Sequence, residues 1–272
     1  MVRSDSRAGV LRWNGEHALS TRTEEGPTTV SETSRGGAGP KAPPLDARTG
    51  SRASAGGPDP RCEGRARRRI SVTVVDLPLV EGEPATRETV DPRDVATSLG
   101  HFVRIRHGLD PSGGLGPGSH NFFRGVALAD WDEQTRRSIQ GLKDTIDTSM
   151  ATEAWERTLE APPWTGPDVW IHGDLKSDNL LRVGDEITAV LDFGGLGVGD
   201  PACDLIVAWD LLTPENRDRF QAATSVDDAT WARGRGWALS IAVIALPYYR
   251  DNNPGMVRYA RDVLSAVFAD RD

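Results

Sequence analysis

The pattern of apolar and polar residues divides the chain into two parts near residue 70. Residues 1–69 show no helical or strand periodicity and contain only eight large apolar or aromatic residues. Further along, apolar residues recur at the spacings of amphipathic helices and short strands. A segment with so few apolar side chains cannot bury enough surface to offset the entropy lost on ordering. We therefore predict that residues 1–69 are a disordered low-complexity segment and that residues 70–272 form a folded domain.

The folded part begins with a β-branched stretch at residues 70–80, which the pattern predicts to be a strand or a linker. Asp91 and Pro92 then predict a helix start, because Asp caps a helix and Pro fits its first turn. This helix ends at Gly108 and has one apolar face, formed by Val95, Leu99, Phe102 and Val103. Residues 110–125 are rich in Gly and Pro, which is typical of a loop.

Helices dominate the pattern in the rest of the chain, near residues 131–146, 150–161, 201–212, 214–222, 228–246 and 254–269. The helix at 228–246 is apolar nearly all round, which is typical of a core helix. Three short apolar runs between the helices predict strands, at 169–172, 179–182 and 187–193. Gly184 and Asp185 predict the turn of a hairpin between the last two strands. We expect Trp164, Trp170 and Trp237 to lie in the core.

Composition sharpens this division and excludes several protein classes. Residues 1–69 hold 13 basic and 8 acidic residues, and residues 70–272 hold 19 and 32, so the second part carries a net charge of −13. The net charge of −8 for the whole chain argues against a general nucleic-acid binder. The basic run at 65–69 is either an arm that touches RNA or a membrane or, as we expect, a solvated stretch.

Cysteine content and hydropathy indicate a cytoplasmic protein without a membrane partner. Two cysteines, Cys62 and Cys203, exclude a disulfide scaffold and a cysteine-based zinc site. The longest apolar stretch, residues 237–247, is too short to cross a bilayer. The first residues contain no apolar segment typical of a signal peptide.

Residues 171–205 concentrate the polar residues that can carry chemistry. They comprise a strand, a polar loop with Asp174 and Asn179, a hairpin, and a second polar loop that opens at Asp192. Because a hairpin brings the ends of its strands together, we expect Asn179 and Asp192 to lie side by side, with Asp174 close by. An amide and a carboxylate oxygen suit Mg²⁺, which takes hard oxygen ligands and completes its shell with substrate phosphates. A second carboxylate can accept a proton from an attacking hydroxyl.

This segment resembles the catalytic loop of protein kinases and, more closely, that of the aminoglycoside phosphotransferase family. His172–Asn179 matches the pattern H-G-D-L-x-x-x-N, and Leu191–Gly194 matches the metal-binding loop at the interval found in that fold. Residues 199–205 look like the helix-opening segment of the family. The resemblance implies an α+β, protein-kinase-like fold, represented mainly by the helical C-terminal lobe with a short catalytic-loop hairpin.

The resemblance also implies a reaction, namely phosphoryl transfer from ATP to a hydroxyl of a small molecule. Asp174 would be the base, or the orienting group, for that hydroxyl. Asn179 and Asp192 would bind the Mg²⁺ that bridges the ATP phosphates. The implied substrate is aminoglycoside-like, and the negative charge of the folded part would suit a cation.

Three further residues of the motif acquire roles in the same way. His172 would brace the catalytic loop, as the equivalent position does in kinases. Asp204 would accept hydrogen bonds from the loop backbone. Lys176 would either touch the transferring γ-phosphate or face solvent. The sequence assigns no residue to the binding of the nucleotide base.

The nucleotide-binding lobe of a kinase-like fold is not evident in the sequence. That lobe needs a loop over the phosphates and a strand lysine. Of the lysines, Lys41 lies in a Pro-rich stretch, Lys143 lies among the C-terminal helices, and Lys176 lies in the catalytic loop. Residues 79–83 resemble the hinge that joins the lobes. We interpret the chain as the product of a truncated or frame-shifted gene, with residues 1–69 read out of frame, or as a natural pseudo-enzyme.

Three alternatives to an aminoglycoside kinase stay open. Other small-molecule kinases of the same fold act on choline, homoserine, fructosamine or sugars. A non-catalytic kinase-like fragment is favoured by the lack of a strand lysine. A metal phosphoesterase is faintly suggested by residues 173–179, but that chemistry needs several histidine ligands, and His172 is the only histidine near the motif.

Overall fold

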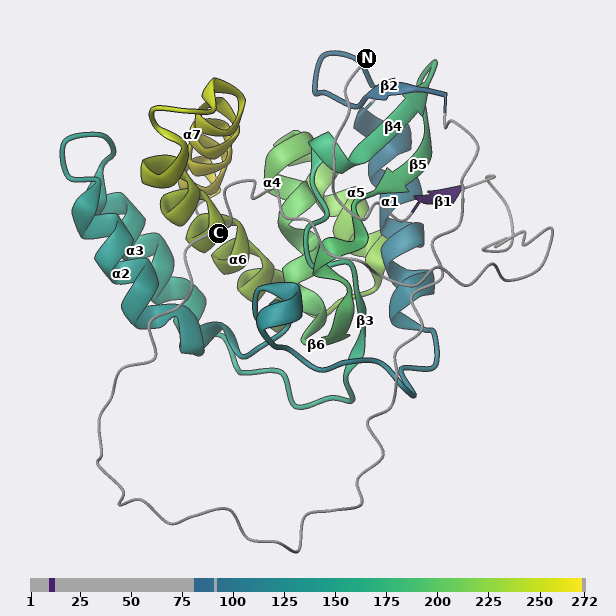
Figure 1. The fold of residues 1–272 in the computed structure, drawn as a ribbon, viewed down its shortest axis with the longest axis horizontal. Helices are drawn as coiled ribbons and strands as arrows, with labels where there is room; N and C mark the ends of the chain where they lie inside the picture. Colours follow the sequence, from purple (N-terminus) through teal and green to yellow (C-terminus); the bar gives the residue numbers. More distant parts are fainter. Residues whose placement is uncertain (1–9, 13–80, 91, 271–272) are drawn as a thin grey trace, which may run out of the picture. The chain divides into compact units, whose positions relative to one another are not determined.

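The computed structural model describes residues 10–12, 81–90 and 92–270, and every structural statement below concerns these residues (Figure 1). Residues 10–12 form strand β1 (Val10–Arg12). The rest of the segment predicted to be disordered lies outside the described residues. The same holds for the predicted strand or linker at 70–80 and for the predicted cap at Asp91.

The strands form two small antiparallel sheets. Strands β1, β2 (Glu83–Pro84), β4 (Leu180–Val183) and β5 (Glu186–Leu191) pair in the order β1-β5-β4-β2. The other sheet pairs β3 (Val169–Ile171) with β6 (Gly197–Gly199). The three predicted strands are confirmed as β3, β4 and β5, within one or two residues of their expected bounds. β6 escaped prediction because a Gly-Val-Gly run has no strand preference of its own and pairs only where β3 offers an edge.

The β4–β5 hairpin brings the two polar loops together, as its sequence predicts. Gly184 takes a positive φ of 62° in the turn, a conformation that glycine adopts without a steric penalty. The register pairs Leu180 with Val190. Asn179, just before β4, and Asp192, just after β5, therefore emerge at the same end of the hairpin.

Seven α-helices and five short 3₁₀ helices make up most of the described chain. The α-helices are α1 (Pro92–His107), α2 (Asp132–Gly141), α3 (Thr148–Leu159), α4 (Val207–Leu211), α5 (Pro214–Thr224), α6 (Asp228–Tyr249) and α7 (Pro254–Ala269). The 3₁₀ helices are η1 (Ser119–Asn121), η2 (Leu128–Trp131), η3 (Ser177–Asn179), η4 (Phe193–Gly195) and η5 (Pro201–Ile206). Every predicted helix is present. The helix expected at 131–146 ends early, at Gly141. Asp147 then caps α3 by accepting from the Ser149 and Met150 amides.

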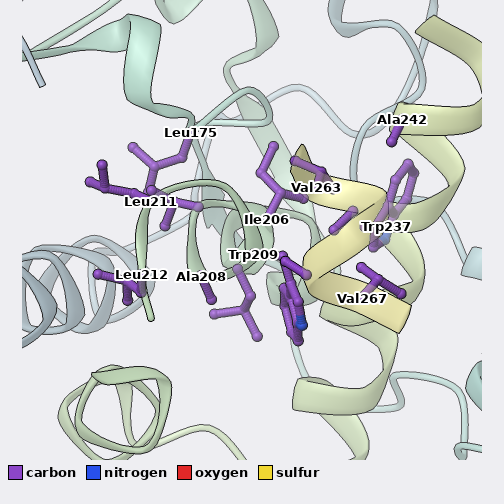
Figure 2. Close-up of a cluster of buried hydrophobic side chains, with 14 of the residues drawn as sticks. Leu175, Ile206, Ala208, Trp209, Leu211, Leu212, Trp237, Ala242, Val263 and Val267 are labelled. Atoms are coloured by element: carbon purple, nitrogen blue, oxygen red, sulfur yellow. The ribbon is translucent and has the colours of Figure 1, made fainter. Parts of the chain in front are cut away.

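The hydrophobic core surrounds α6, which packs against α7, α3, α2 and η5. Figure 2 shows part of this core, where side chains of η5 and α4 such as Ile206 and Trp209 lie near Val263 and Val267 of α7. Trp237 of α6 is fully buried, as predicted. None of the described helices is long and apolar enough to cross a membrane.

Trp164 and Trp170 correct the prediction that both lie in the core, because each is only half-buried. Their indole N–H groups donate to the backbone carbonyls of Pro167, at 3.1 Å, and Asp110, at 2.8 Å. An indole that finds a carbonyl partner at a loop satisfies its polar end without complete burial. Trp155 and Trp209 are fully buried instead.

Candidate functional site

The candidate site is the loop that follows β3 and begins at His172. The His172 ring is completely buried and uses both nitrogens: Nε2 donates to the Leu191 carbonyl at 2.9 Å, and Nδ1 accepts from the Asp174 amide at 3.3 Å. Burial, followed by the nearby Arg106 guanidinium, lowers the pKa of His172, so the ring is neutral at physiological pH. This imidazole links the start of the loop to the end of β5 and has no nitrogen left for a metal.

Asp204 of η5 binds the backbone of the first part of the loop. Its Oδ1 accepts from the amides of His172, at 2.9 Å, and Gly173, at 3.0 Å. Its Oδ2 accepts from the Arg106 guanidinium and lies 3.1 Å from Nε2 of His107, both at the end of α1. Burial alone would raise the pKa of Asp204, but Arg106, His107 and the loop amides more than offset it and hold the pKa far below its usual range. The carboxylate is therefore permanently charged.

Asp174, Lys176 and Asn179 lie together in the centre of the loop. The Asp174 side chain is 31% exposed, and its Oδ2 lies 3.7 Å from Nζ of Lys176. Nδ2 of Asn179 donates to the Asp174 carbonyl at 2.7 Å and to Oδ2 at 3.2 Å. This orientation directs the Asn179 amide oxygen away from Asp174, and that oxygen accepts no hydrogen bond from the described residues.

Asp192 lies on the second loop, directly after β5. Its backbone is left-handed, with φ 57°, and its carboxylate accepts from the Gly194 amide at 3.2 Å. A non-glycine residue in this conformation is uncommon and marks a locally constrained turn. The pKa of Lys176 is lowered by burial but raised more by carboxylates that include both Asp174 and Asp192. The Lys176 ammonium therefore lies in the field of both loops.

Sequence reasoning missed several residues that hold this site together: Arg87, Arg106, His107 and Asp210. The Asp210 carboxylate accepts from the Ser177 amide at 2.5 Å, and Arg87 donates to backbone carbonyls of α4. None of these residues belongs to a local motif, because each meets its partner across a long stretch of sequence. The one signal in the sequence was a polar residue, Arg106, in the last turn of a helix with an apolar face, where it is buried.

The oxygen donors fit a hard divalent cation that needs further ligands. Asn179 offers an amide oxygen, and Asp192 offers a carboxylate at the same end of the hairpin. Over the described part of the chain, no group of three His, Cys, Asp or Glu residues could hold a metal ion alone. A pair of hard oxygens suits Mg²⁺, which completes its shell with water and phosphate oxygens.

Solved structures of aminoglycoside phosphotransferases are similar in fold to this chain. A structure of the GDP complex of a mutant aminoglycoside 2'-phosphotransferase-IIIa matches with a TM-score of 0.51 and 15% identity, over 71% of this chain and 68% of that one. The wild-type GDP complex gives a TM-score of 0.48 and 16% identity, over 71% and 70%. The first of these matches confirms the α+β, protein-kinase-like fold that the sequence predicts for the described helices and hairpin.

The family itself follows from the sequence comparison. A model of the phosphotransferase enzyme family matches residues 57–237, and the chain belongs to this family. An aminoglycoside 3'-phosphotransferase of Escherichia coli is 33% identical over 103 residues, which is 34% of this chain. The match spans 38% of the length of that relative.

Proposed function

We propose that this chain carries the catalytic loop of an ATP-dependent phosphotransferase that acts on a hydroxyl of an aminoglycoside-like small molecule. The observation that carries the proposal is the cluster of Asp174, Lys176 and Asn179 on a loop that Asp204 holds from below. Such a loop supplies a partly exposed base, a cation and a free amide oxygen within one short segment. Phosphoryl transfer depends mainly on this kind of positioning and charge stabilisation.

Asp174 is the proposed base. Its partly exposed carboxylate accepts the proton of the substrate hydroxyl as the hydroxyl oxygen bonds to the γ-phosphorus of ATP. The bond from that phosphorus to the β–γ bridging oxygen breaks, and ADP leaves. Lys176, beside Asp174, is placed to contact the transferring phosphoryl oxygens, and His172 and Asp204 keep the loop backbone in place.

Asn179 and Asp192 are the proposed Mg²⁺ ligands. The free amide oxygen of Asn179 and the carboxylate of Asp192 support this assignment, because both are hard oxygen donors. When bound, the ion neutralises charge on the phosphates. The two residues also set the position of the phosphates relative to Asp174.

An aminoglycoside-like substrate is favoured by the family and by charge. The E. coli relative is named an aminoglycoside 3'-phosphotransferase. The charge of −13 on residues 70–272 favours association with a polycation. Choline, homoserine and sugars are the competing acceptors, so all of them belong in the assay beside a panel of aminoglycosides.

The test is phosphoryl transfer by the full chain and by Asp174→Asn, followed by mass spectrometry of the acceptor. We expect Asp174→Asn to lower kcat by about 10²- to 10⁴-fold, the usual contribution of a general base, with the melting temperature changed by only a few degrees. Asp185→Asn, an exposed residue in the hairpin turn, is the matched control and keeps wild-type turnover. Unchanged turnover in Asp174→Asn contradicts the assigned base, and wild-type protein that phosphorylates no acceptor contradicts the function.

A non-catalytic kinase-like protein is the second candidate. In the described part of the chain, Lys143 is exposed between α2 and α3 and Lys176 lies in the catalytic loop, so neither occupies a strand. Isothermal titration with Mg·ATP separates the candidates. Binding that Asp192→Asn weakens supports the phosphotransferase, whereas no heat of binding supports the non-catalytic protein.

A further inference from the structure

Asp210 contacts the backbone of the second half of the catalytic loop. It belongs to α4 and is only 7% exposed. Its Oδ2 accepts from the Ser177 amide at 2.5 Å. Ser177 begins η3, and the residue before it, Lys176, gives no side-chain cap to this turn. The distant Asp210 carboxylate therefore takes the amide that a local cap would otherwise satisfy.

The η5–α4 element binds the catalytic loop at two points. Asp204 of η5 holds the amides of His172 and Gly173, and Asp210 of α4 holds the amide of Ser177. The η5–α4 element runs without interruption from Pro201 to Leu211. Because both carboxylates come from this element, the two ends of the loop keep a fixed separation, and the segment between them contains Asp174 and Lys176.

Arginines fix the end of α4 that carries Asp210. Arg87, just after β2, donates through Nε to the Asp210 carbonyl and through Nη2 to the Trp209 carbonyl, each at 2.6 Å. Arg217 donates to the Ala208 carbonyl at 3.2 Å. The last turn of a helix leaves carbonyls unpaired, and guanidinium groups satisfy them. The position of the Asp210 side chain thus depends on Arg87, outside the helical core.

We propose that Asp210 is a positioning residue that holds Ser177 and so sets the placement of Lys176 and Asn179, with Arg87 tying this anchor to the segment after β2. The inference rests on the proposed function, because it assigns those two residues to phosphate and Mg²⁺. Asp204 contacts the loop at the His172 and Gly173 amides, and the hydrogen bonds of Asp174 and Asn179 run within the loop. Asp210 adds a contact from the η5–α4 element at Ser177, next to the residues that would face the phosphates.

The surroundings of Asp210 explain why a carboxylate occupies this place. The titratable groups that face it are the charged Lys176 and Asp178 of the loop, the charged Arg87 after β2, and the neutral Tyr259 phenol of α7. Burial raises the pKa of Asp210, and the Ser177 hydrogen bond lowers it only in part. A buried carboxylate is costly where an apolar residue would pack. The gain is a charge-assisted hydrogen bond to the loop, which is stronger than a neutral one.

Amide hydrogen exchange in the full-length protein without ligand tests this anchor independently of activity. We expect the Ser177 and Asp178 amides of Asp210→Ala to exchange about tenfold faster than wild type, because a lost hydrogen bond eases local opening. Asp210→Asn keeps an oxygen acceptor and restores most of the protection. Asp218→Asn, the same change on the exposed face of α5, leaves the loop unchanged. Amides of α6 exchange at the wild-type rate in all three variants.

A transfer assay adds a second readout. Asp210→Ala lowers kcat with little change in KM for the acceptor, and Asp210→Asn recovers part of kcat. Wild-type exchange of Ser177 in Asp210→Ala overturns the proposal, and so does an equal increase in α6, which would indicate general destabilisation. If wild-type protein transfers no phosphoryl group, the proposed function fails, and the exchange comparison still decides whether Asp210 anchors the loop.

Discussion

Two aspartates on the η5–α4 element are buried to a similar degree and have opposite pKa shifts. Asp204 faces Arg106 and His107 as well as two loop amides, and these groups hold its pKa far below the usual range. Asp210 receives one loop amide, and burial raises its pKa to about 6. Partners, not depth, therefore decide whether a buried carboxylate is charged. Asp204 is a permanent anchor, whereas Asp210 changes its charge within the range of ordinary buffers.

The raised pKa of Asp210 predicts a specific pH dependence of stability. Between its ordinary value of 3.8 and about 6, the folded state binds more protons than the unfolded state. The favourable contribution is therefore complete below pH 3.8 and is lost as the pH rises through 6. Relative to Asp210→Asn, the free energy of unfolding of the wild type falls by roughly 2 kcal/mol from pH 4 to pH 7. Urea unfolding at several pH values measures this difference, and a difference that does not vary with pH contradicts it.

At the scale of elements, α6 organises the core by allowing neighbours to approach its backbone. A Cβ atom on Gly234 would lie 2.7 Å from the Leu205 Cβ, and one on Gly236 would lie 2.5 Å from Leu128 and closer still to Thr158. These glycines weaken the helix intrinsically. They are retained where η5, η2 and α3 pack against α6, so close packing offsets their low helix propensity.

The close approach at Gly236 predicts a reversal of the usual effect of alanine. In an open helix, Gly→Ala stabilises by about 0.5–1 kcal/mol. We expect Gly236→Ala to destabilise the protein by about 1–3 kcal/mol, because the methyl group overlaps Thr158 and Leu128. Gly141→Ala in α2 is the control, since nothing lies within 4 Å of its added Cβ. Thermal unfolding of both variants measures the contrast, and an unchanged or raised melting temperature for Gly236→Ala would refute the packing argument.

At the scale of the whole molecule, two observations place the start of the folded domain at different residues. One is the change in composition near residue 70, and the other is the extent of the family match. The family model begins at residue 57, thirteen residues before the boundary predicted from apolar content. Strand β1 (Val10–Arg12) also pairs with β5. The domain boundary and the disorder of residues 1–69 stay predictions.

Limited proteolysis tests that boundary. The 12 arginines of residues 1–69 offer many trypsin sites, and a segment with few apolar residues exposes them. We expect a resistant fragment that begins near residue 70, identified by mass spectrometry. Digestion in denaturant is the control and leaves no such fragment. Protection of the first 60 residues, β1 included, would show that this part is folded.

Local pattern was sufficient for most elements and for the catalytic-loop motif. The helices, the β4–β5 hairpin and the emergence of Asn179 and Asp192 at the same end of that hairpin follow from periodicity, turn residues and antiparallel geometry, all of which act over a few residues. The prediction that Trp164 and Trp170 are buried in the core was wrong. Each indole N–H donates to a loop carbonyl, and this partner lets the ring stay half-buried. The Gly-Val-Gly strand β6 has no local preference that could reveal it.

The sequence by itself determined the order of elements, the family motif and the residue types at the site. Tertiary structure decided what holds that site in place. Arg106 meets Asp204 across 98 residues, and Arg87 meets the Asp210 carbonyl across 123. The sequence around a side chain does not predict a contact with a partner so far away along the chain. Asp204 and Asp210 hold the loop only because α1 and η5–α4 pack around it. The charge state of each buried carboxylate depends on the groups that the fold places beside it.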